Sequence, residues 1–121
     1  MGYTRYWTRT EKPITQEFID EVERIFADCE KRDIRICNWN GKDNPTVTMD
    51  MVAFNGNGII GADHESCVFD NNKTGFDFCK TARKPYDYAV RRVLVAAETL
   101  GLVTDVSDDG FCDEISDIEW V

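Results

Sequence analysis

The residues whose types and spacing could do chemistry are concentrated in one short segment, residues 80–87, which reads Lys-Thr-Ala-Arg-Lys-Pro-Tyr-Asp. Three of them, Lys80, Arg83 and Lys84, are cations that directly precede Pro85. Proline favours the first position of a helix, so Lys84 would lie near the N-cap. Lysine has only hydrogen-bond donors and cannot satisfy the free backbone N–H groups of a helix start. The segment, called here the basic junction, is therefore predicted to hold an electropositive and poorly capped helix N-terminus.

An N-terminus of this kind is suited to binding a phosphate or a carboxylate, such as the phosphates of a nucleotide. Free N–H groups, the positive end of the helix dipole and nearby cations would all attract the anion. We predict a ligand site formed by Lys80, Thr81, Arg83, Lys84, Tyr86 and His64, the last of these brought close only if the strands pair suitably. In the alternative, Asp87 satisfies the N–H groups, and the cations are solvated or paired with acidic residues near the C-terminus.

The C-terminal quarter of the chain carries almost all of the net charge of −9. Residues 93–121 contribute −8 and contain no Lys or Arg, whereas residues 1–92 contribute −1. The acids of segment 105–121 are Asp105, Asp108, Asp109, Asp113, Glu114, Asp117 and Glu119. Such a surface repels nucleic acid and attracts basic surfaces. We expect no direct nucleic-acid binding, and the alternative function is a protein-binding inhibitor whose acidic surface imitates a nucleic-acid backbone.

The sequence contains no pattern that supports catalysis, a metal or a cofactor. Phosphate-binding loops, dinucleotide fingerprints, nucleophile elbows and zinc-protease motifs are all absent. The five cysteines are widely spaced without a C-x-x-C pair, and His64 is the only histidine. They are predicted to be buried free thiols rather than metal ligands. An enzyme acting through His64 and Lys80 ranks below the two binding functions.

Free thiols indicate a reducing compartment, which favours a cytoplasmic protein. The first residues lack the apolar run of a signal peptide. No apolar stretch approaches the roughly 20 residues that a transmembrane helix needs. We therefore expect no membrane contact, and self-association stays open.

Two helices and about five strands are predicted to position the basic junction. Apolar residues at helical spacing, with Thr15 as N-cap, predict a helix over residues 15–31. A second amphipathic segment predicts a helix over residues 85–100, ended by Gly101. The expected fold is a single α+β domain, residues 1–121, with both helices on one face of an antiparallel sheet of about five strands.

The predicted strands cover residues 3–9, 34–39, 46–54, 64–70 and 75–80, with a short strand possible at 103–106. Segments 64–70 and 75–80 read as a hairpin because the residues between them are turn formers. Phe76, Phe78 and Lys80 share one face of their strand, but charge does not decide which face is buried. Aromatic and arginine side chains in the first strand either form the core or offer a stacking platform: Tyr3, Arg5, Tyr6, Trp7 and Arg9.

Three segments together resemble a group of short uncharacterised proteins encoded by bacteriophages and mobile elements. These are Phe54-Asn55-Gly56, residues 64–69 and the F-x-F-C-K-T-A-R-K-P-Y-D segment of residues 76–87. The likeness is strongest in the middle third of the chain, and it transfers no catalytic or binding residues. It implies a setting, because small accessory phage proteins often counter host defence by inhibiting a nuclease complex or by sequestering a nucleotide signal. The resemblance therefore implies a counter-defence protein of the host-cell cytoplasm whose partner is an anionic small molecule or a basic host protein.

Overall fold

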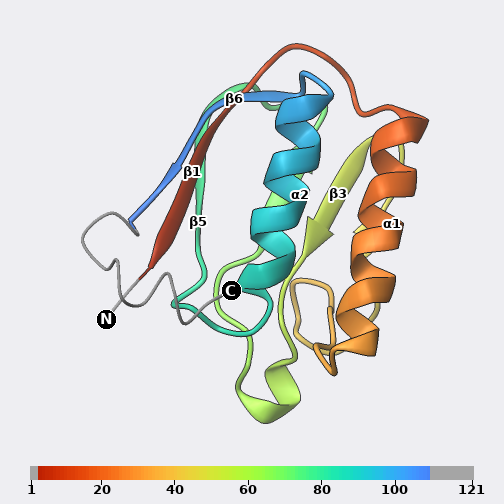
Figure 1. Ribbon diagram of the computed structural model, residues 1–121, viewed down its shortest axis with the longest axis vertical. Helices are drawn as coiled ribbons and strands as arrows, with labels where there is room; N and C mark the ends of the chain where they lie inside the picture. Colours follow the sequence, from red (N-terminus) through yellow and green to blue (C-terminus); the bar gives the residue numbers. More distant parts are fainter. Residues whose placement is uncertain (1–2, 110–121) are drawn as a thin grey trace.

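The computed structural model describes residues 3–109, which form two α-helices, a short 3-10 helix (Gly58–Ile60) and two small antiparallel sheets (Figure 1). One sheet has the strand order β5 (Gly75–Lys80), β1 (Thr4–Arg9), β6 (Val103–Asp108). The other has the order β2 (Thr46–Val47), β3 (Met51–Phe54), β4 (Cys67–Asp70). The α+β class is as predicted. The single sheet of about five strands is wrong, because the strands divide into two sheets of three.

The division arises where a hairpin was predicted. Strands β4 and β5 follow each other along the chain, yet β4 pairs with β3 and β5 pairs with β1. The β1–β5 register runs from Thr4 opposite Lys80 to Arg9 opposite Gly75. The turn between β4 and β5 therefore carries the chain from one sheet to the other. Local turn chemistry predicts that the chain reverses, but it does not specify the partner strand.

Two further strand predictions are only partly correct. In place of a strand at residues 34–39, a single bridge joins Cys37 to Asn55. The predicted strand 46–54 is interrupted after Val47, because the Thr48 hydroxyl accepts the Met51 N–H at 3.0 Å and closes a tight turn. This turn pairs β2 with β3.

Both helix predictions are confirmed, with small shifts at their ends. Helix α1 (Gln16–Lys31) begins after Thr15, whose side chain accepts the Phe18 N–H at 3.2 Å. Helix α2 (Asp87–Thr99) is followed by Gly101 at a φ of 82°, a left-handed conformation that glycine adopts without steric cost. The two helices pack against each other, and α2 also contacts β6. In Figure 1, α2 accordingly lies between β1 and α1.

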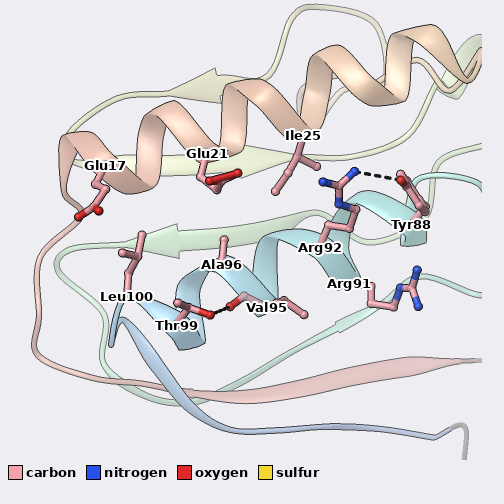
Figure 2. Close-up of a pocket in the computed structure, with 10 residues that line it drawn as sticks. All are labelled: Glu17, Glu21, Ile25, Tyr88, Arg91, Arg92, Val95, Ala96, Thr99 and Leu100. Atoms are coloured by element: carbon pink, nitrogen blue, oxygen red, sulfur yellow. Dashed lines mark hydrogen bonds between the residues drawn. The ribbon is translucent and has the colours of Figure 1, made fainter.

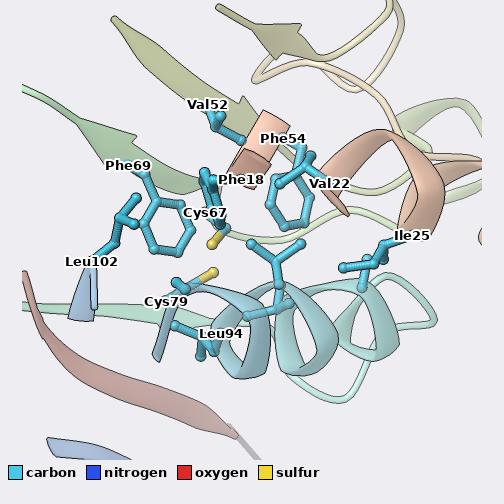
Figure 3. Packing of buried hydrophobic residues seen from close by; sticks show 14 of the residues in the cluster. Phe18, Val22, Ile25, Val52, Phe54, Cys67, Phe69, Cys79, Leu94 and Leu102 are labelled. Carbon is cyan, nitrogen blue, oxygen red and sulfur yellow. The ribbon is translucent and has the colours of Figure 1, made fainter. Parts of the chain in front are cut away.

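One hydrophobic cluster joins both sheets and both helices (Figure 3). Trp7 of β1 stacks on Phe69 of β4 with ring centroids 5.5 Å apart, which links the two sheets directly. Phe18 of α1 meets the same Phe69 ring edge-on at 5.6 Å. Side chains of α1, α2, β3, β4 and β5 fill the space around these rings. Because the sheets share this core, neither of them is an independent layer.

The described cysteines belong to this core. Cys29, Cys37, Cys67 and Cys79 are buried free thiols, as predicted, and Cys112 lies outside the described residues. Burial raises the pKa of Cys29 to about 11 and that of Cys67 well above its ordinary value. The thiols of Cys29 and Cys67 are therefore held in the neutral, unreactive form.

Candidate functional site

A buried ion pair fixes the basic junction from beneath. The Asp87 carboxylate accepts hydrogen bonds from Arg5 Nε at 2.9 Å and from Arg5 Nη2 at 2.7 Å. The Thr81 hydroxyl donates to the same carboxylate at 2.5 Å. Asp87 and Thr81 have no exposed surface, and Arg5 is 6% exposed. The Asp87 carboxylate thus joins the helix start to β1 and does not cap the N–H groups of α2, which removes one part of the alternative interpretation.

The expectation of free N–H groups at this helix start is wrong. Helix α2 begins at Asp87, two residues after Pro85, and no side chain caps it. Instead, the N–H groups of residues 87–89 donate to the carbonyl oxygens of residues 84–86 at 2.9, 3.2 and 2.9 Å. A tight turn before the helix therefore satisfies the donors that an anion would have met.

The loop between β5 and α2 has an uncommon backbone conformation. Ala82 and Arg83 are consecutive non-glycine residues with φ of 53° and 57°, in the left-handed region. The Tyr3 carbonyl holds the loop by accepting the N–H groups of Thr81 at 2.9 Å and Ala82 at 3.2 Å. The Lys84 N–H donates to the Thr81 carbonyl at 3.0 Å. Strained loops of this kind persist only where the surroundings determine them, and many lie at functional sites.

Side chains, rather than backbone donors, therefore present the positive charge. Lys80 is exposed, and its Nζ lies 5.9 Å from the ring centroid of Phe78. The Lys84 Nζ donates to the Gly61 carbonyl at 3.1 Å. Arg83 lies over the Tyr3 ring at 4.1 Å. Among residues 3–109, Lys80 and Lys84 form no ion pair with a carboxylate.

The loop that contains His64 lies beside the junction, as the predicted site requires. Glu65 bridges the two segments, because its N–H donates to the Lys80 carbonyl at 3.1 Å and its carboxylate accepts the Lys80 N–H at 2.8 Å. Asn55 fixes the other side by accepting the His64 N–H at 3.0 Å and donating to the His64 carbonyl at 2.9 Å. The His64 side chain is exposed.

Two predicted ligand residues, Thr81 and Tyr86, are fully buried. The Tyr86 hydroxyl donates to the Glu65 carbonyl, and burial raises the pKa of Tyr86 above its ordinary value. Both side chains support the loop geometry. The surface available to a ligand comes from Lys80 and Lys84, with Arg83 and His64 nearby.

An exposed aromatic row borders Lys80. Phe76 is 66% exposed and Phe78 is 41% exposed, on the same face of β5 as Lys80. Phe76 stacks on Tyr6 with centroids 6.1 Å apart and lies 6.1 Å from Phe78. Of the stacking platform predicted in the first strand, Tyr6 alone belongs to this exposed row. The other four members are buried: Tyr3, Arg5, Trp7 and Arg9. The alternation along β5 shows in the sequence, but the solvent side became visible only with the pairing to β1.

The described acidic residues do not neutralise the two lysines. Asp108 accepts Arg5 Nη1 at 3.1 Å. Asp109 accepts the Thr4 N–H at 3.0 Å and the Tyr6 hydroxyl at 2.9 Å, and this last hydrogen bond raises the pKa of Tyr6. Asp105 is exposed. The remaining predicted partner-binding acids lie outside the described residues: Asp113, Glu114, Asp117 and Glu119.

One concavity beside the junction, lined only by described residues, is small. Its volume is about 40 Å³, and Gly56, Pro85 and Tyr86 line part of it. A nucleotide would therefore lie on the surface rather than in a closed pocket. Within residues 3–109, no cluster of three His, Cys, Asp or Glu residues is placed to hold a metal ion. None of the helices described for these residues has the length and apolar character needed to cross a membrane.

In comparisons with family models, curated proteins and solved structures, none matched this chain.

Proposed function

We propose that this protein binds an anionic, nucleotide-like ligand at the basic junction and does so without catalysis. One observation carries the proposal: Lys80 and Lys84 form no ion pair with a carboxylate among residues 3–109. Of the acids nearby, Asp87 and Asp108 are bound to Arg5, and the Glu65 carboxylate accepts the backbone N–H of Lys80. The positive charge of the two lysines is therefore available to a ligand. Hydrogen bonds between an ammonium group and a phosphate are about twice as strong as neutral ones.

The support beneath the junction favours binding by a preorganised loop. The Arg5–Asp87 pair, the Thr81 hydroxyl and the Tyr3 carbonyl hold the loop backbone in one conformation. A loop that is already ordered loses little conformational freedom when a ligand binds. The rigid loop thus compensates in part for the exposure of the lysines to water and salt.

The aromatic row favours a nucleotide over a simple anion. Phe78 and Phe76 lie next to Lys80 on the outer face of β5. A base that stacks on an exposed aromatic ring gains about 1–3 kcal/mol. A ligand with phosphates at Lys80 and Lys84 and a base over Phe78 would use both features of this surface.

The resemblance to phage and mobile-element proteins supports a biological setting for the proposal. A protein that binds a nucleotide signal without turning it over can act by sequestering it in the host cytoplasm. On this proposal the protein counters host defence by lowering the concentration of a free nucleotide.

Thermal-shift and calorimetric titrations with mono-, di- and cyclic nucleotides, and with pyrophosphate, test the proposal. A ligand at 100 times its Kd should stabilise the fold by about 2.7 kcal/mol. Lys80→Ala combined with Lys84→Ala should abolish the shift, whereas Lys42→Ala combined with Lys73→Ala, two exposed lysines elsewhere, should leave it intact. Phe78→Ala should weaken the binding of nucleotides but leave the binding of pyrophosphate unchanged. The proposal fails if no nucleotide binds, or if the double variant at the junction binds like the wild type.

The alternative function, inhibition of a basic host protein through the acidic C-terminal surface, has less support. Asp105 and Asp108 are exposed, but Asp108 binds Arg5 and Asp109 binds Thr4 and Tyr6, so part of this acidic surface is already engaged within the domain. Salt-sensitive capture of a defined basic nuclease complex by a variant lacking Lys80 and Lys84 would favour this alternative.

A further inference from the structure

An open groove of about 700 Å³ lies between α1 and α2 (Figure 2). The helices run in opposite directions along it, so the start of α1 lies beside the end of α2. Glu17 lies at that end of the groove, and Arg91 and Arg92 lie at the other end. This surface, called here the helix groove, therefore has an acidic end and a basic end.

Two of these charges, Glu17 and Arg91, have no ion-pair partner within the described part of the chain, although Arg91 lies 6.0 Å from the centroid of the Tyr88 ring. By contrast, Arg92 binds Asp28 at 2.7 Å and Glu21 binds Arg24 at 2.6 Å. The unpaired charges of Glu17 and Arg91 thus have opposite signs and lie at opposite ends of the groove.

The centre of the helix groove is apolar. Val95 is 58% exposed, although it lies in a helix whose other large apolar side chains face the core. Arg91, Val95 and Thr99 are spaced by four residues and form one ridge along α2. Ile25 and Ala96 are also part of the groove lining. The groove and the ridge are adjacent, and ridges of this spacing pack into grooves of other helices.

We propose that the helix groove is an interface between two copies of this chain related by a two-fold axis that passes near Val95. A two-fold axis brings the acidic end of one groove to the basic end of the other, so Glu17 of each copy faces Arg91 of the second copy. The same contact then forms twice. The α2 ridge of each copy lies in the groove of the other and removes both Val95 side chains from water. An unlike partner would need a matching charge pattern of its own, whereas a second copy already has it.

Charge reversal tests this symmetry directly. In sedimentation experiments at about 100 µM, the wild-type protein should have about twice the monomer mass of 13.9 kDa. Glu17→Arg and Arg91→Glu should each be monomeric, because like charges then face each other. An equimolar mixture of the two variants should form a heterodimer, because both of its contacts pair opposite charges again. Val95→Asp should be monomeric, both alone and when it is mixed with Glu17→Arg or with Arg91→Glu.

Two matched controls keep the test independent of general effects of charge. Glu23→Arg lies on α1 and Lys73→Glu lies in the turn before β5; both positions are exposed and outside the helix groove. Both variants should dimerise like the wild type, with unchanged circular dichroism and urea midpoints. A monomeric wild type would overturn the proposal, as would dimeric single variants or a monomeric mixture. Because no nucleotide is present, the result does not depend on the proposed ligand.

Discussion

Arg5 and Asp87 are 82 residues apart in the sequence and form a buried ion pair with two parallel hydrogen bonds, of 2.9 and 2.7 Å. The pair joins the central strand β1 to the first turn of α2. The loop that presents Lys80 and Lys84 lies directly before that turn. The position of the proposed ligand site thus depends on a contact between β1 and α2.

Breaking this pair from one side should be costly. We expect Asp87→Ala to lower the free energy of unfolding by about 3–5 kcal/mol, because it leaves the Arg5 guanidinium buried without its main partner. Urea denaturation measures the change. Adding Arg5→Met to Asp87→Ala should recover part of the loss, since no buried charge then remains. Strictly additive effects of the two substitutions would contradict this account.

Asn55 should be needed to hold the loop that carries His64. Its side chain accepts the N–H groups of Gly56 at 2.7 Å and His64 at 3.0 Å in a buried environment. Asn55→Ala leaves these donors unsatisfied, at an expected cost of about 1–3 kcal/mol for each one that stays buried. Chemical denaturation gives the value, with the exposed Asn72→Ala as a control near zero. Equal stabilities of the two variants would disprove the assignment.

Asp28 should make stability depend on acid pH. Hydrogen bonds from the Tyr88 hydroxyl and from Arg32 hold the pKa of Asp28 below its ordinary value. The unfolded chain therefore takes up this proton more readily, so the contribution is complete above the ordinary pKa and is lost as pH falls through the lower, folded value. Asp28→Asn should reduce stability at pH 7 and flatten its fall below about pH 4.

Urea midpoints between about pH 2 and 7 measure this effect. Glu23→Gln, an exposed change on the same helix, serves as the charge-matched control. A pH profile of Asp28→Asn parallel to that of the control would show that the contacts of Asp28 do not stabilise the carboxylate.

The core thiols should be unreactive in the folded protein. With a pKa of about 11, Cys29 is ionised in only about one molecule in a thousand at pH 8, and Cys67 is likewise held neutral by burial. In a Cys112→Ser variant, a disulfide reagent should label the remaining cysteines only at the rate of unfolding. Urea should then release all four for reaction. Rapid labelling of the native variant would show that the core opens without global unfolding.

The features that the sequence predicted correctly are local ones. The apolar spacing of α1, its cap at Thr15 and the glycine after α2 each depend on neighbours within a few residues. The pairing of β5 with β1 instead of β4 depends on residues about 70 positions away, for which a single sequence holds no signal. The two-sheet arrangement was therefore beyond reach, although the strands β1, β5 and β6 were placed well.

The candidate site divides in the same way. The cluster of Lys80, Arg83 and Lys84 is visible in the sequence as a run of cations, and the exposure of Lys80 is the usual behaviour of lysine, whereas Arg83 and Lys84 are half-buried. The ion pair between Asp87 and Arg5 was not predicted, because predicting it requires knowing that β1 lies beside the start of α2. The side of β5 that faces solvent, with Phe76 and Phe78, needed the same knowledge.

The central place of β1 in its sheet has a consequence for synthesis of the protein. Its two neighbours, β5 and β6, come from residues 75–80 and 103–108, so β1 is made before either of the strands that pair with it. Helix α1 and the β2–β3–β4 sheet can form on the ribosome, while β1 still has both edges unpaired. Closure of the domain, and with it assembly of the junction that carries Lys80 and Lys84, thus waits until β6 has been made. Newly made chains would be most exposed to aggregation and proteolysis during that interval.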